Sequence, residues 1–153
     1  MSGLKAGVAG SVVAAVVILI LLPLIATLGV SHPLNLSLMA FLVALAVYVY
    51  LSFGKSLGEP WFVRLGPPVI GASAAGVALL WAGQQVGTAL IAVAYWGEPV
   101  MGYFKRLREA SRPWAALFLG SAAAYAYTLT VVLLGLADVA KLAALMYFLG
   151  RLR

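Results

Sequence analysis

Few residues in this chain of 153 could perform chemistry. The sequence contains four acidic residues, one histidine and no cysteine. Without cysteine, disulfides, thiolate metal sites and thiol catalysis are excluded. The single histidine, His32, lies in a Ser-His-Pro sequence and lacks the partners that metal binding or proton transfer requires. We interpret it as a helix-start residue, and the sequence predicts no catalytic residue, no cofactor site and no metal site.

The four carboxylates are predicted to lie near helix ends, at Glu59, Glu98, Glu109 and Asp138. An ionisable group in the middle of a membrane span would indicate a path for ions or protons, and none is expected here. Asp138 is interpreted as the N-cap of a short helix over 139–150. Its pairing with Lys141, three residues later, would support that helix locally.

One spacing of basic residues resembles a known motif. Lys105 is followed after six residues by Arg112-Pro113, which resembles the first motif of the lipid phosphatases of the phosphatidic acid phosphatase type 2 family. That family also uses a Pro-Ser-Gly-His motif and a second, nucleophilic histidine, and the sequence contains neither. The resemblance covers nine residues without the catalytic half. The cations are therefore predicted to contact lipid headgroups or nucleic-acid phosphates, and they are Lys105, Arg106, Arg108 and Arg112.

Composition indicates a membrane protein. The chain is 65% hydrophobic and 9% charged, whereas a soluble domain is about 45–50% apolar and about 25% charged. A soluble protein of this size could not bury so much apolar surface in its own core. The net charge of +6 is typical of proteins that contact anionic lipid headgroups, and nucleic acid is the other common partner of a basic chain.

The gaps between charged residues predict the spans. Residues 6–54, 65–97 and 113–137 contain no Asp, Glu, Lys or Arg, and a membrane helix needs about 20 apolar residues. Glycines and prolines predict a loop over 54–68 and a break near 30–33. The predicted fold is all-α, a polytopic transmembrane bundle of four long apolar helices, a short amphipathic interfacial helix and a short apolar C-terminal helix. The predicted helices lie near 4–29, 33–53, 68–96, 99–110, 113–135 and 139–150, in a single domain over 1–153.

Three features stay open at this point. The segment 99–110 fits an interfacial helix or a solvated loop equally well. Residues 1–22 are interpreted as part of a retained span, and a cleaved signal peptide is the alternative. Basic residues near the termini favour a cytoplasmic location for both, but the dense group ending at Arg112 is predicted on the other side and argues against it.

A polar seam is predicted between the helices at 68–96 and 113–135. Small residues would let the two backbones approach, and amides or hydroxyls would bond across the gap. The seam either stabilises the packing alone or lines a hydrophilic path. Its residues are Gly76, Gly83, Gln84, Gln85, Gly87, Thr88, Ser121, Tyr125 and Thr128.

The segment 142–149 is apolar on every side, and as part of a short helix it could not cross a bilayer. We therefore expect a second copy or another subunit to cover it. The predicted contacts are Leu145, Met146, Tyr147 and Phe148.

Three functions are compatible with these observations. The first is a non-catalytic structural membrane protein, a subunit of a homo-oligomer or of a larger assembly with other membrane subunits. The second is a small channel or carrier that uses the polar seam. The third is an assembly protein of a virus-like or filamentous particle, in which basic residues contact nucleic acid or lipid.

Overall fold

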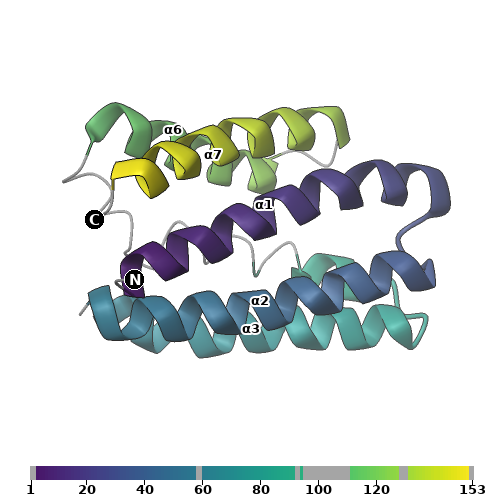
Figure 1. Ribbon diagram of the computed structural model, residues 1–153. Coiled ribbons are helices and arrows are strands. Elements are labelled where there is room, and N and C mark those ends of the chain that lie inside the picture. The colour runs from purple at the N-terminus through teal and green to yellow at the C-terminus, as the bar shows by residue number, and fades with distance from the viewer. Residues whose placement is uncertain (1–2, 58–59, 92–93, 95–110, 128–130, 152–153) are drawn as a thin grey trace.

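A computed structural model describes residues 3–57, 60–91, 94, 111–127 and 131–151. Side chains are described at these positions except 54–57, 61, 118–119, 122–127 and 131. This part of the chain is helical, without strands, which confirms the all-α prediction (Figure 1). Within these described residues, four helices are long and apolar enough to cross a membrane.

Helix α1 spans Gly3–Leu28 and helix α2 spans Pro33–Leu57, so the predicted break between them is confirmed. Gly29 ends α1 with a φ of 87°, and its N–H donates to the Ile25 carbonyl at 2.9 Å. This is the left-handed cap that glycine favours. His32 acts as the helix-start residue that the sequence predicts, because its Nδ1 accepts a hydrogen bond from the Leu34 N–H at 3.3 Å.

Helix α3 spans Pro60–Trp81, so the predicted loop over 54–68 is wrong. Pro67 and Pro68 lie inside this helix. A helical proline leaves the carbonyl four residues earlier without its usual donor, which for Pro67 is that of Val63. The Tyr50 hydroxyl of α2 donates to this carbonyl at 3.1 Å. A neighbouring helix thus replaces the bond that the proline removes, as the interior of a bilayer requires.

The expectation of one helix over 68–96 is also wrong, because α3 ends at Trp81 and helical backbone resumes at residue 86. Gly83 has a φ of 78°. Its N–H donates to Leu80 O at 3.0 Å, and the Gln84 N–H donates to Leu79 O at 2.7 Å. These two bonds form a Schellman motif, a helix end that favours glycine at this position.

Helix α6 spans Arg112–Tyr127 and helix α7 spans Val131–Arg151. The predicted helix end at residue 135 is wrong, because Gly135 lies inside α7. Among the residues that the structure describes, the fourth candidate span is therefore α7, over Val132–Arg151, in place of the predicted helix at 113–135. The C-terminal helix is long enough to cross a bilayer by itself.

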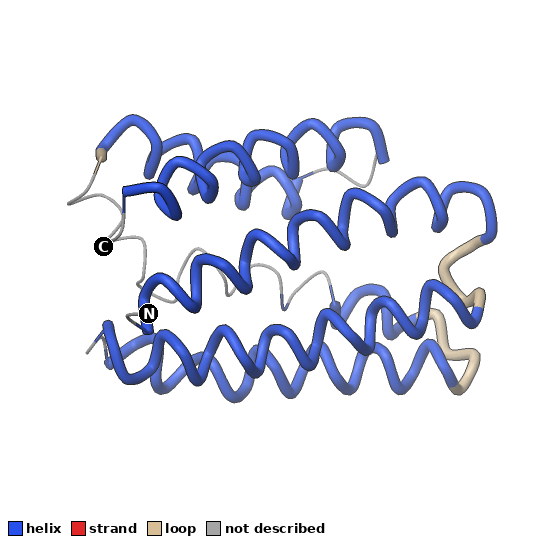
Figure 2. Tube along the Cα trace, in the orientation of Figure 1, coloured by secondary structure: helices blue, strands red, loops and turns tan. Residues whose placement is uncertain are grey.

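Helix α1 is central and packs against α2 on one side and α7 on the other (Figure 1). Helix α3 packs on α2, and α6 packs on α7. Both termini lie at one end of the bundle. The loop at 29–32 and the turn at 82–85 lie together at the opposite end (Figure 2).

Candidate functional site

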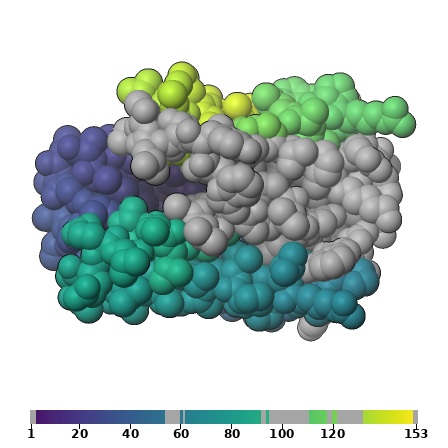
Figure 3. All heavy atoms as spheres, turned by 180° about the vertical axis from the view of Figure 1, so that it is seen from behind, coloured from purple at the N-terminus to yellow at the C-terminus, as the bar shows by residue number. Residues whose placement is uncertain are grey.

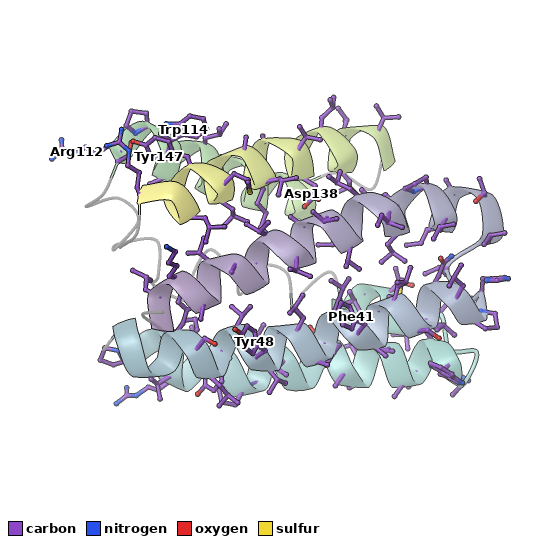
Figure 4. All side chains as sticks on the ribbon, in the orientation of Figure 1. Phe41, Tyr48, Arg112, Trp114, Asp138 and Tyr147 are labelled. Carbon is purple, nitrogen blue, oxygen red and sulfur yellow. The ribbon has the colours of Figure 1, made fainter. Side chains whose placement is uncertain are left out.

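Two charged residues are buried in the middle of α7, although no mid-span charge was predicted from the sequence. Asp138 is 0% exposed and Lys141 is 2% exposed. Lys141 is ten residues from either end of the 21-residue helix Val131–Arg151. The interpretation of Asp138 as an N-cap is therefore wrong. It lies inside the helix, on the side of α7 that faces α1 (Figure 4).

The two charges are three residues apart, which places them on neighbouring positions of one helix face. A charged side chain in the hydrocarbon region costs at least about 2.5–3.5 kcal/mol on insertion scales. An opposite charge on the same face lowers that cost, and the residual cost is typical of a functional position.

Lys141 also lines a cavity of about 150 Å³. The cavity lies between α7 and the three helices α1, α2 and α3, and Ile91 and Ala94 contribute to its wall. Its described lining is apolar except for four side chains, and Lys141 is the only one of these that is charged. The other three are Ser11, Tyr50 and Ser73. The arrangement can hold a small molecule that offers an anion or a hydrogen-bond acceptor to one ammonium group.

The glycines of the predicted seam do not bring α3 and α6 together. Gly76 of α3 and Gly87 of the helical segment 86–91 face each other, since a Cβ atom at Gly76 would lie 2.8 Å from the Gly87 carbonyl oxygen. The close approach is thus between α3 and the segment that follows it, not between α3 and α6. Gly83 lies in the turn, with no atom within 4 Å of a Cβ placed there, so the expectation that it faces another helix is wrong.

The polar seam residues are likewise not brought together at mid-depth. Gln84 and Gln85 lie in the turn at the end of the bundle, where Gln85 Nε2 donates to Ser31 Oγ at 3.3 Å. Thr88 is exposed, and Ser121 is buried on α6, which packs on α7. Seen from the opposite side, α6 and α3 lie along opposite margins of the molecule (Figure 3). The Tyr125 side chain and Thr128 lie outside the described residues.

The predicted oligomer contacts divide into two groups. Leu145 and Phe148 are 0% exposed and belong to a core cluster with Val8 and Phe53 of the same chain. The expectation that a second copy covers these two residues is therefore wrong. Met146 is 53% exposed. Tyr147 is half-buried and stacks on Trp114.

The basic residues whose side chains are described lie at one end of the bundle, apart from Lys141. Helices α1 and α7 place Lys5 and Arg151 there, and Arg64 and Arg112 are near the starts of α3 and α6 (Figure 1). Arg112 is thus on the same side as the termini, opposite to the prediction. The other cations predicted to contact headgroups, Lys105, Arg106 and Arg108, lie outside the described residues.

The fold and the cavity define an all-α protein with, in its described part, four potential membrane spans and two charged residues buried inside the bundle. Within the described residues, no group of three or more His, Cys, Asp and Glu side chains could hold a metal ion. No protein-family profile, curated protein or solved structure matches the chain.

Proposed function

We propose that the protein is a small membrane carrier or channel whose solute site is the cavity beside Lys141. The observation that carries this proposal is the 2% exposure of a mid-helix lysine that lines a cavity. A purely structural bundle would gain no stability from such a group, because apolar residues of similar volume are often as stabilising as a buried ion pair, or more so. This is the second of the functions considered from the sequence, with its site moved from the predicted seam to the cavity.

The solute is a small monovalent anion. Lys141 is the charged residue of the described lining, and a buried ammonium binds an anion through short, charge-assisted hydrogen bonds. A cavity of about 150 Å³ holds one molecule the size of benzene. Its apolar walls favour an anion with an apolar part, such as a short-chain monocarboxylate, over a fully hydrated ion.

The test is uptake of labelled propionate and chloride by liposomes that contain the purified protein. A D138L/K141M variant removes both charges together and so leaves no unpaired charge in the core. We expect this variant to lose uptake by about tenfold or more, since a hydrogen bond to a charged group is worth about 1.5–3 kcal/mol. The matched control is R64Q, which removes an exposed cation near the start of α3. Equal propionate uptake by wild type and D138L/K141M would contradict the proposal and favour the structural function.

For this function we propose an orientation in which the end of the bundle that carries Lys5, Arg64, Arg112 and Arg151 faces the cytoplasm. The described residues at the opposite end, in the loop 29–32 and the turn 82–85, include no Lys or Arg. Such an asymmetry is the positive-inside pattern. Because the chain has no cysteine, single-cysteine variants report orientation directly. In intact cells a membrane-impermeant maleimide should label S31C and leave S111C unlabelled, and the reverse result would contradict this orientation.

A further inference from the structure

An arginine and two aromatic rings form a stack where α6 begins and α7 ends. The rings of Trp114 and Tyr147 are stacked, with centroids 4.8 Å apart and an interplanar angle of 14°. The guanidinium carbon of Arg151 lies 5.3 Å from the centroid of the Tyr147 ring. Arg112, also exposed, precedes Trp114 by two residues at the same end of the bundle (Figure 4). Two helices thus supply two cations around one aromatic stack.

This geometry prepares the arginine to bind a phosphate. The cation–π contact with Tyr147 restricts the position of the guanidinium group, while exposure of Arg151 leaves its N–H groups accessible. A planar guanidinium can bind two phosphate oxygens at once. Trp and Tyr are also the residues that gather at the depth of lipid headgroups in membrane proteins.

We propose that this stack binds the phosphate of an anionic membrane lipid. The lipid, and not a free anion, is favoured by exposed apolar side chains close to the stack in the sequences of the same two helices. Leu117 of α6 is 41% exposed and Met146 of α7 is 53% exposed. An acyl chain can cover such residues while the headgroup stays at the arginine. This site is separate from the cavity beside Lys141 and does not depend on the proposed transport.

The experiment is native mass spectrometry of the protein after incubation with equal amounts of phosphatidylglycerol and phosphatidylcholine. We expect wild type to retain phosphatidylglycerol preferentially. The R151Q variant should retain about tenfold less of it, which corresponds to one lost charged contact. The matched control is R64Q, an exposed arginine of the same end on α3, for which retention should change less than about twofold.

Two further variants test the role of the ring. Y147F keeps the cation–π face and should retain the lipid, whereas Y147L keeps Arg151 but removes the face and should lower retention. Equal losses in R64Q and R151Q would show diffuse attraction to charge and overturn the proposal, as would wild-type retention in Y147L. Displacement of phosphatidylglycerol by millimolar inorganic phosphate would show that a free anion is the ligand. Melting temperature and helix content of each variant separate lost binding from lost folding.

Discussion

The cavity beside Lys141 has two unlike walls. The apolar wall, formed by α1, α2 and α3, contains three polar side chains but no charged one among its described residues. Its shape depends on close packing, since a Cβ atom at Gly66 would overlap the Tyr50 ring. The wall formed by α7 carries a buried lysine, with an aspartate one turn earlier in the chain. Close packing of small and large residues can build an apolar wall in many sequences. The charged wall is what gives this cavity a chemical preference, so the two walls should respond to different kinds of substitution.

The largest loss of stability is expected for K141M, in the charged wall formed by α7. This variant leaves Asp138 buried without the cation on its own helix face. Removing one member of a buried charged pair costs about 3–5 kcal/mol. We expect a lower free energy of unfolding, measured by denaturant titration of the protein in detergent micelles.

The control for this prediction is D138L/K141M, in which no charge is left uncompensated. This double variant should recover most of the stability that K141M loses. If K141M is as stable as wild type, another group neutralises Asp138. That result would contradict the expectation that the charged wall responds to the loss of one charge.

The next largest loss of stability is expected for G66A, in the apolar wall. The added methyl group would overlap the Tyr50 ring, and overpacking of this kind costs about 1–3 kcal/mol. Gly71 lies on the same helix with no atom within 4 Å of a Cβ placed there. G71A should therefore be neutral or stabilising, because alanine is favoured over glycine in a helix. Similar melting temperatures for G66A and G71A would show that shape does not control this wall.

Two stretches of the chain show how far local sequence patterns predict this fold. Residues 54–68 are rich in glycine and proline, yet most of this stretch is helix, because Tyr50 bonds the carbonyl that Pro67 leaves free. Residues 82–85 lie in a charge-free stretch, yet they form a turn that brings Gly76 and Gly87 together. In the first case a contact with another helix satisfies the backbone, and such a contact is not visible in the local pattern. In the second case the bonds at Gly83 are local, but Gly83 is one of several glycines in its charge-free stretch and no helix-start residues follow it. The break at Gly29 was predictable because Ser31, His32 and Pro33, which can start a helix, follow that glycine directly.

The candidate site could be predicted only in part. Asp138 and Lys141 were predicted to lie outside the four spans, at the N-cap and in the first turn of a short helix over 139–150. Charges three residues apart can instead share one face inside a bundle, and this spacing was the available signal. The cavity itself joins residues as distant in sequence as Ser11 and Lys141. No periodicity in one segment predicts that juxtaposition.

A smaller loss of stability is expected at the turn that ends α3, for G83A. The φ of 78° at Gly83 is a conformation that costs an L-residue about 1–2 kcal/mol. Since the position has open space around it, the loss would come from backbone strain and not from a clash. The melting temperature in detergent should fall for G83A and not for G71A. An unchanged value in both would show that the left-handed turn is not required.

The smallest effect is expected for Y50F, which tests the hydrogen bond that lets proline enter the apolar wall. Phenylalanine keeps the ring that stacks on Phe62, with centroids 5.4 Å apart, and removes only the hydroxyl bonded to Val63 O. Polar bonds between membrane helices average about 0.6 kcal/mol, so a loss of that order is expected in the free energy of unfolding. The control Y48F removes a hydroxyl from an exposed tyrosine of the same helix and should have no effect. If Y50F/P67A is no more stable than Y50F alone, the tyrosine does not compensate for the proline. Stability regained in the double variant would show that it does, because alanine restores the backbone N–H that Val63 O otherwise lacks.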